Sequence, residues 1–212
     1  GCDEFAFGAY NEDLQDISNQ GSVRVIFGSN DSGCHSEPRM VTLVNGVTNA
    51  RAGYSVSGGH DIDGDTIPDL IVGAYDYDTG PITPGLIHFV PGSWLAGLTT
   101  QAVNDAVTPT EIYTMPTAAE NRIEGTTHDE EFGRSVGLIP GLYSDGRAGI
   151  IVGRPLGDTA GAHRTGGASI YGWNIESTAF QEVLTIGGET GRIDGRTGEF
   201  VAGGLGPNGQ PT

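Results

Sequence analysis

The sequence contains no lysine, so all of its basic residues are arginines. Ten arginines stand against 27 aspartates and glutamates, which gives a formal net charge of −17 at pH 7. A surface this acidic repels nucleic acid and anionic lipid, so neither is an expected partner. The same charge suits a protein that works with calcium, or in salt-rich or extracellular surroundings.

Long apolar runs are also missing from the sequence. No stretch approaches the ~20 residues needed to cross a bilayer, so membrane insertion is not expected. No segment carries an apolar stripe at helical spacing over a useful length, which argues against a helical core. No signal peptide is visible, and the chain is interpreted as a mature or trimmed product.

Cysteine is scarce, with Cys2 and Cys34 the two examples in the chain. A metal or redox pair is normally closely spaced, and these two residues are not. A disulfide is favoured because Cys2 lies just before one expected strand and Cys34 just after its expected antiparallel neighbour. Such a bridge would fit an oxidising compartment. Two free buried thiols are the alternative.

Glycine, by contrast, is abundant, and it marks three copies of one sequence unit. The clearest marker is Gly-Tyr-Ser-Val at 53–56, which recurs as Gly-Arg-Ser-Val at 133–136 and as Gly-Glu-Phe-Val at 198–201. Three further elements of each unit are short, apolar or alternating, and bounded by turn residues, as strands are. They lie at 5–10, 70–75 and 150–155, then at 21–28, 85–90 and 167–172, and finally at 40–44, 110–114 and 180–186.

Four short strands in a unit of roughly 65–80 residues are typical of a β-propeller blade. The predicted fold class is therefore all-β, with about three blades of four antiparallel strands in a single region over 1–212. Strand 1 is expected at about 52–60, 132–139 and 197–205, and strands 2–4 at about 3–46, 69–116 and 149–188. The segments 122–125 and 192–195 are interpreted as passages into the next copy.

The order of the strands is circularly permuted, because the chain starts at strand 2 of one blade and stops inside the strand 1–2 loop of another. Three blades are fewer than the about 4–8 that close a propeller, and the end blades would keep unpaired edges. Pairing with a second chain is preferred and would give a six-bladed ring. Head-to-tail contacts that do not close would give a filament. The remaining alternative is a piece of a longer propeller.

The most distinctive stretch is the acidic loop at 61–69, Asp-Ile-Asp-Gly-Asp-Thr-Ile-Pro-Asp. Calcium takes six to eight oxygen ligands, and alternate residues of a tight loop can direct several oxygens at one centre. The loop is not an EF-hand, which needs Gly at place 6 and Glu at place 12. An acidic surface turn is the alternative interpretation. The predicted calcium ligands are the side chains of Asp61, Asp63, Asp65 and Asp69 and the backbone carbonyl of Ile67.

Residues 53–75 resemble the FG-GAP repeats of integrin alpha-subunit propellers, through the Gly-x-Ser-Val entry, the acidic loop and the Leu-Ile-Val-Gly-Ala run. The resemblance implies blades whose acidic loop binds calcium on the face opposite the ligand, with the same five residues as ligands. The third copy keeps one carboxylate, Asp145, at the matching places, and the C-terminal copy keeps none. One good calcium site per chain is expected. A composite site from Asn208, Gln210 and a neighbouring chain's Glu4 is a weak alternative.

Two motifs are typical of enzymes but lack the required context. Residues 133–137 match the G-x-S-x-G nucleophile elbow, and residues 204–209 match G-x-G-x-x-G. Both motifs need a helix directly after them, and none is expected here. The five histidines show no metal-ligand spacing. No catalysis is therefore predicted.

The loops between strands 2 and 3, at 11–20, 76–84 and 156–166, are expected to emerge together on one face. Loops on a rigid scaffold commonly carry binding, although solvated turns are the alternative. The predicted partner-binding residues are Tyr75, Asp76, Tyr77, Asp78, His163 and Arg164.

The preferred function is a calcium-binding, secreted or cell-surface adhesion or assembly module without catalysis. Its partners would be a protein or glycan at the cell surface and further copies of itself through open blade edges, as a dimer or filament. A carbohydrate-binding lectin of propeller fold is the first alternative. A fragment of a larger surface protein or hydrolase is the second, since a fold does not fix a function.

Overall fold

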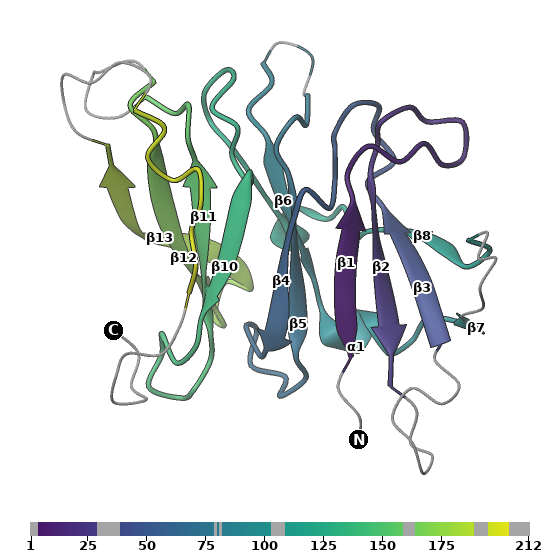
Figure 1. Ribbon diagram of the computed structural model, residues 1–212. Coiled ribbons are helices and arrows are strands. Elements are labelled where there is room, and N and C mark those ends of the chain that lie inside the picture. Colours follow the sequence, from purple (N-terminus) through teal and green to yellow (C-terminus); the bar gives the residue numbers. More distant parts are fainter. Residues whose placement is uncertain are drawn as a thin grey trace.

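The computed structural model describes residues 4–28, 39–78, 80, 82–102, 109–158, 164–188 and 195–203. Within these residues the chain forms three β-sheets that stand side by side (Figure 1). The described helices, α1 (Gly92–Leu95) and η1 (Ala119–Asn121), are about one turn each. In this part of the chain no helix is long and apolar enough to cross a membrane. The all-β architecture of propeller-type blades is therefore confirmed.

The second and third sheets are antiparallel and four-stranded, and their strands follow one another in chain order. Each short strand alternates its side chains between the two faces of the sheet, as the sequence pattern predicts. The second sheet consists of β4 (Ser55–His60), β5 (Asp69–Ala74), β6 (Leu86–Val90) and β9 (Arg122–Glu124). The third consists of β10 (Ser135–Ile139), β11 (Gly149–Arg154), β12 (Gly167–Asn174) and β13 (Ala179–Gly187).

The first sheet starts at the second strand of the unit, which is the permutation expected from the sequence. Its order is β1, β2, β3, and two short strands from a distant part of the chain extend it beyond β3. The strands are β1 (Phe5–Ala9), β2 (Ser22–Phe27), β3 (Arg39–Val44), β7 (Gln101–Ala102) and β8 (Ile112–Thr114).

Two predicted strands differ from the structure. The described part of the segment expected at 197–205 forms only an isolated bridge, at Thr197, and the segment 110–114 has a different partner. The segment 110–114 was expected as the fourth strand of the second blade, but β8 pairs in parallel with β3 of the first sheet. Hydrogen bonds from Thr42 N to Glu111 O (2.9 Å) and from Met115 N to Val44 O (2.9 Å) continue this pairing. The fourth strand of the second sheet is instead β9, which pairs with β6. The outer edge of β3 is covered in this way, so its backbone groups are not left unpaired.

Two apolar layers hold the three sheets together. The layer between the first and second sheets includes Val25, Leu43, Val72 and Leu86. The layer between the second and third sheets includes Ile71, Phe89, Val136 and Ile150, and also Ile62 from the acidic loop. Burial of these side chains is the main source of stability, at roughly 25 cal/mol per Å² of apolar surface.

The repeated glycines form a contact between each copy and the next. In each pair, a methyl group on the glycine of strand 2 would overlap the carbonyl oxygen of the glycine that opens the following copy. The second glycine of every pair has a φ of +84°, which side chains rarely adopt. Only glycine therefore satisfies both positions. The pairs are Gly8 with Gly53, Gly73 with Gly133, and Gly153 with Gly198.

Two serines reinforce the same junctions. The hydroxyl of Ser55 donates to the carbonyl of Gly133 at 2.8 Å, and that of Ser135 donates to the carbonyl of Gly198 at 2.9 Å. Ser135 belongs to the G-x-S-x-G match at 133–137, but it is 8% exposed and lies in a strand rather than at a strand-to-helix turn. Its hydroxyl thus has a structural role in joining two copies.

Candidate metal centre

The acidic loop connects β4 to β5 at the lower edge of the second sheet, at the end opposite the loops that join β5 to β6 and β11 to β12 (Figure 1). This arrangement arises from the local alternation of the sequence. Ile62 points inward and is fully buried in the second apolar layer, whereas Asp61 and Asp63 on either side are half-buried. The hydrophobic anchor therefore fixes the direction of the carboxylates.

Hydrogen bonds within the loop turn the carboxylates toward one another. Asp61 accepts from the backbone N–H of Gly64 (2.7 Å) and of Thr66 (3.0 Å) through its two oxygens. Asp63 accepts from the N–H of Asp65 at 3.1 Å. Such bonds from a side chain to the backbone two to five residues on are typical of Asp-rich turns. Gly64 adopts a φ of +94°, which allows the tight bend.

Three of the four predicted carboxylate ligands lie together. One carboxylate oxygen from each of Asp61, Asp63 and Asp65 lies within 4.8 Å of the other two. Two oxygens bound to the same calcium ion at about 2.3–2.6 Å cannot be more than about 5 Å apart. The spacing and the hard oxygen donors thus fit a divalent cation of the calcium type.

The fourth predicted ligand, Asp69, lies at the end of the loop and is buried, with 2% of its surface exposed. Its two oxygens accept from the N–H of Ile62 (2.7 Å) and of Gly92 (2.9 Å). Burial raises the pKa of Asp69 to about 7, against the effect of these hydrogen bonds. Burial also raises the pKa of Asp63, and the charges of neighbouring aspartates add to this. Like charges held this close are stabilised by a cation.

The Ile67 carbonyl and the Asp69 carboxylate stay predicted ligands. Ile67 itself is 39% exposed at the surface of the loop. The composite site suggested for Asn208, Gln210 and Glu4 involves residues 208 and 210, which lie outside the described part of the chain.

The loop also contacts the third sheet. The N–H of Ala148 donates to the carbonyl of Asp61 at 2.8 Å. A methyl group at Gly64 would lie 3.1 Å from Cδ of Arg147. A cation that orders the acidic loop would therefore also fix the junction between the second and third sheets.

The equivalent loop of the third sheet contains a permanent cation, the guanidinium of Arg147. This side chain is nearly buried, with Nε 2.8 Å from a carboxylate oxygen of Asp145 and Nη1 2.8 Å from the carbonyl of Trp173. Its central carbon lies 4.4 Å from the centre of the Tyr143 ring, a cation–π distance. Arg147 lies in the loop that corresponds to the acidic loop of the second sheet. Its own positive charge balances the single carboxylate of this loop, Asp145.

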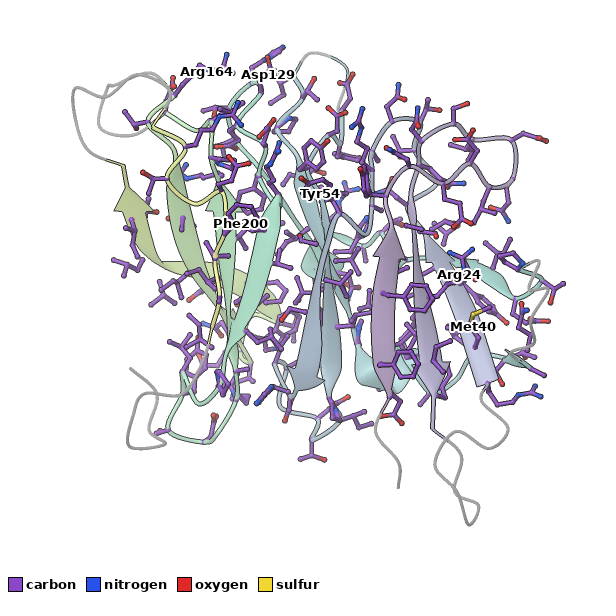
Figure 2. The ribbon with its side chains drawn as sticks, in the orientation of Figure 1. Arg24, Met40, Tyr54, Asp129, Arg164 and Phe200 are labelled. Carbon is purple, nitrogen blue, oxygen red and sulfur yellow. The ribbon has the colours of Figure 1, made fainter. Side chains whose placement is uncertain are left out.

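The opposite end of the sheets carries a cluster of tyrosines and arginines, of which sequence analysis identified Tyr75 alone. The rings of Tyr54 and Tyr75 meet edge to face at 4.6 Å, and Tyr10 packs on Tyr54 at 5.0 Å. Arg134 lies over both Tyr54 (5.3 Å) and Tyr75 (5.2 Å). Figure 2 shows Tyr54, Asp129 and Arg164 in the upper half of the molecule, away from the acidic loop. Tyr54 and Arg134 each directly follow the glycine that opens their copy, Gly53 and Gly133. This shared place in the repeat is the sequence signal that could have linked the two residues.

The predicted partner-binding residues take different positions at this end. Tyr75 is half-buried and accepts a hydrogen bond from Arg51 at 2.9 Å, and Asp76 pairs with the same arginine at 3.1 Å. Tyr77 packs against the first apolar layer. Asp78 and Arg164 are exposed. His163, Cys2 and Cys34 lie outside the described residues, so the predicted contact and disulfide are not tested.

Comparison with known families identifies one match. Residues 52–83 match the FG-GAP repeat family, over a range that includes β4, the acidic loop and β5. A search for relatives among curated proteins gave no match. The matched repeat is the copy that brings the three carboxylates together.

Proposed function

From the FG-GAP repeat at residues 52–83, we propose that the chain is a calcium-binding, extracellular adhesion or assembly module in which the metal is structural. FG-GAP repeats are propeller-type modules, typically without catalysis and typical of extracellular or surface proteins. The observation that carries the proposal is the group of three carboxylates within 4.8 Å on the β4–β5 loop.

The proposed role of the metal follows from the charges of the loop. Asp61, Asp63 and Asp65 repel one another, so the metal-free loop opposes its own folded conformation. A bound Ca²⁺ would neutralise these carboxylates and supply a hard cation for their oxygens. The loop contacts the third sheet through Ala148, so ordering the loop would also hold the second and third sheets in place. The tyrosine-rich end would then be a rigid surface for a partner.

Calcium should raise the thermal stability of the chain. Binding to the folded state alone adds about 2.7 kcal/mol at a free concentration of 100 times Kd, which corresponds to about 5–10 °C in the melting temperature of a chain this size. We expect isothermal titration calorimetry to show one site per chain. Differential scanning calorimetry with calcium and with a chelator measures the change in stability.

The substitution Asp63→Asn should abolish most of this calcium-dependent gain, because it removes one charge from the cluster. The matched control is Asp78→Asn, an exposed aspartate at the other end of the sheets, which should keep the full gain. The proposal is wrong if the chelator leaves the melting temperature of the unmodified chain unchanged.

A second candidate function is carbohydrate recognition at the tyrosine-rich end. The observation that favours it is the exposure of two neighbouring rings, Tyr10 at 40% and Tyr54 at 37%, beside the charged groups of Arg134 and Glu131. Exposed aromatic rings can stack on the apolar faces of sugars, while charged groups accept or donate hydrogen bonds.

A glycan array is the direct measurement for this candidate. Binding of a defined glycan class that falls at least about tenfold with Tyr54→Ala, and not with Ser144→Ala in the exposed turn between β10 and β11, would support it. An array without signal at high protein concentration would reject carbohydrate recognition and leave a protein partner for this end.

A further inference from the structure

The acidic loop of the second sheet and the β10–β11 loop of the third sheet lie side by side at the lower end of the molecule (Figure 1). Their contact consists of two consecutive residues of the β10–β11 loop. Ala148 donates its N–H to the carbonyl of Asp61, and the side chain of Arg147 runs over Gly64. A methyl group on Gly64 would lie 3.1 Å from Cδ and 3.8 Å from Nε of Arg147. The contact therefore places a positive charge beside the proposed calcium ligands.

The guanidinium of Arg147 is held in this place by three groups of its own sheet. Its Nε donates to a carboxylate oxygen of Asp145 at 2.8 Å, and its Nη1 donates to the carbonyl of Trp173 at 2.8 Å. The ring of Tyr143 lies below it, with its centre 4.4 Å from Cζ. The side chain is only 10% exposed. Unlike a surface arginine, Arg147 thus keeps its charge at a fixed distance from the acidic loop.

That distance is short enough for a direct electrostatic effect. Gly64, over which Arg147 lies, donates its N–H to Oδ1 of Asp61 at 2.7 Å. Because the bonds within Gly64 are about 1.5 Å each, Nε of Arg147 lies within about 10 Å of this carboxylate oxygen. The screening length is about 30 Å at an ionic strength of 0.01 M, so the charge of Arg147 acts on the whole acidic loop.

The charge of Arg147 has opposite effects on the metal-free and metal-bound loop. Without a metal, it offsets part of the repulsion among Asp61, Asp63 and Asp65. With calcium bound, it repels the ion, because both are cations. The partner carboxylate of Asp145 does not cancel this repulsion, since its side chain is 52% exposed and its charge is screened more strongly by water.

We propose that Arg147 of the third copy sets the calcium affinity of the second copy's acidic loop and makes it weaker than the carboxylates alone would give. This role rests on the calcium site proposed above. At about 10 Å in water, the repulsion between calcium and one guanidinium corresponds to about a fourfold change in Kd. Calcium sites of extracellular modules have a Kd of about 10⁻⁴–10⁻³ M, so a charge that weakens the site suits the proposed location.

Calcium titration of Arg147→Gln tests the proposal directly. At about 0.01 M ionic strength, isothermal titration calorimetry should give a Kd about fourfold lower than in the original chain, because a repelling charge is removed. Arg147→Lys keeps the charge but not the forked geometry of the guanidinium, and its Kd should stay within about twofold of the original. An unchanged circular dichroism spectrum shows that each variant is folded.

Salt separates the effect of charge from an effect of packing. At about 1 M salt the screening length is about 3 Å, so the difference in Kd between Arg147→Gln and the original chain should disappear. The matched control is Arg196→Gln, which removes an exposed arginine beside the bridge from Thr197 to Gly166 of the β11–β12 loop, at the other end of the third sheet. It should change Kd by less than about 1.5-fold at either salt concentration.

Asp145→Asn is an independent second variant and should act in the opposite direction. It removes an attractive charge from the same loop, so we expect the Kd for calcium to rise about twofold or more at low salt. Its side chain is half exposed, and its loss leaves the bond from Arg147 to the Trp173 carbonyl in place. The variant therefore keeps the test decisive even if Arg147→Gln fails to fold.

The possible failures of the two proposals are distinguishable. If the original chain binds calcium and Arg147→Gln binds it with an equal or higher Kd, the role of Arg147 is wrong and the calcium site stands. A Kd for Arg147→Lys that matches Arg147→Gln, or a difference that persists at about 1 M salt, would show that packing rather than charge is responsible and would overturn the proposal. An original chain that binds no calcium would overturn both proposals.

Discussion

The substitution Gly73→Ala should destabilise the fold by about 3 kcal/mol or more, which is about 10 °C in melting temperature for a chain of this size. The added methyl group would overlap the carbonyl oxygen of Gly133 and the hydroxyl oxygen of Ser55. The carbonyl cannot move away easily, because it accepts the Ser55 hydrogen bond and belongs to a residue held at a φ of +84°. Urea or thermal unfolding measures the change.

The matched control for this prediction is Gly97→Ala. A methyl group there would lie 3.4 Å from the carbonyl of Trp94, an ordinary contact distance, and no unusual backbone angle is involved. We expect this variant to unfold within about 2 °C of the original chain. If Gly73→Ala behaved like Gly97→Ala, the close approach of one copy to the next would not be the constraint that requires glycine.

Acidification should destabilise the chain through His88, which is buried on β6 between the first and second sheets. Its side chain is 2% exposed, and its Nε2 lies 2.7 Å from Nδ2 of Asn45. Burial lowers the pKa of His88 to about 4, and the positive charge of Arg122 acts in the same direction, while a backbone group of Pro116 opposes it. The folded state therefore favours neutral histidine, whereas the unfolded chain titrates near 6.5.

The direction of the pH effect follows from these two values. Neutral His88 makes its full contribution to the free energy of unfolding above pH 6.5. This contribution is lost as the pH falls from 6.5 toward 4, because the unfolded state binds a proton at His88 more tightly than the folded state does. Between pH 7.5 and 5 the loss is about 2 kcal/mol. The free energy of unfolding measured at both pH values, in the original chain and in His88→Gln, isolates this part.

The glutamine of His88→Gln does not titrate. The amount by which its free energy of unfolding falls below that of the original chain should therefore shrink by about 2 kcal/mol between pH 7.5 and pH 5. An equal pH dependence in both chains would show that carboxylates, rather than His88, dominate acid unfolding.

The features predicted correctly from sequence are those that short segments determine by themselves. The apolar run of β5 and the Gly-rich turns around it specify a buried strand without reference to the rest of the chain. The grouping of Asp61, Asp63 and Asp65 is equally local, since one buried residue, Ile62, and a few hydrogen bonds to neighbouring backbone groups orient all three. The family resemblance of this copy rests on the same residues.

The features that sequence analysis missed depend on partners far along the chain. Ile112–Thr114 reads as a strand, but its partner β3 lies about seventy residues earlier, and no local signal distinguishes that partner from β6. Arg122–Glu124 is too short to stand out as a strand, although it completes the second sheet. The role of Arg147 depends on the carbonyl of Trp173, 26 residues away, so the sequence around Arg147 does not reveal it.

The glycine pairs have a consequence for how such a chain gains or loses copies. Each junction is encoded in two places, with the small residue on strand 2 of one unit and the matching carbonyl at the entry of the next. A duplication or deletion that begins and ends at equivalent points of the unit keeps every pair matched. One with unequal end points would set a side chain against a carbonyl, so length changes in this architecture are confined to whole multiples of the unit.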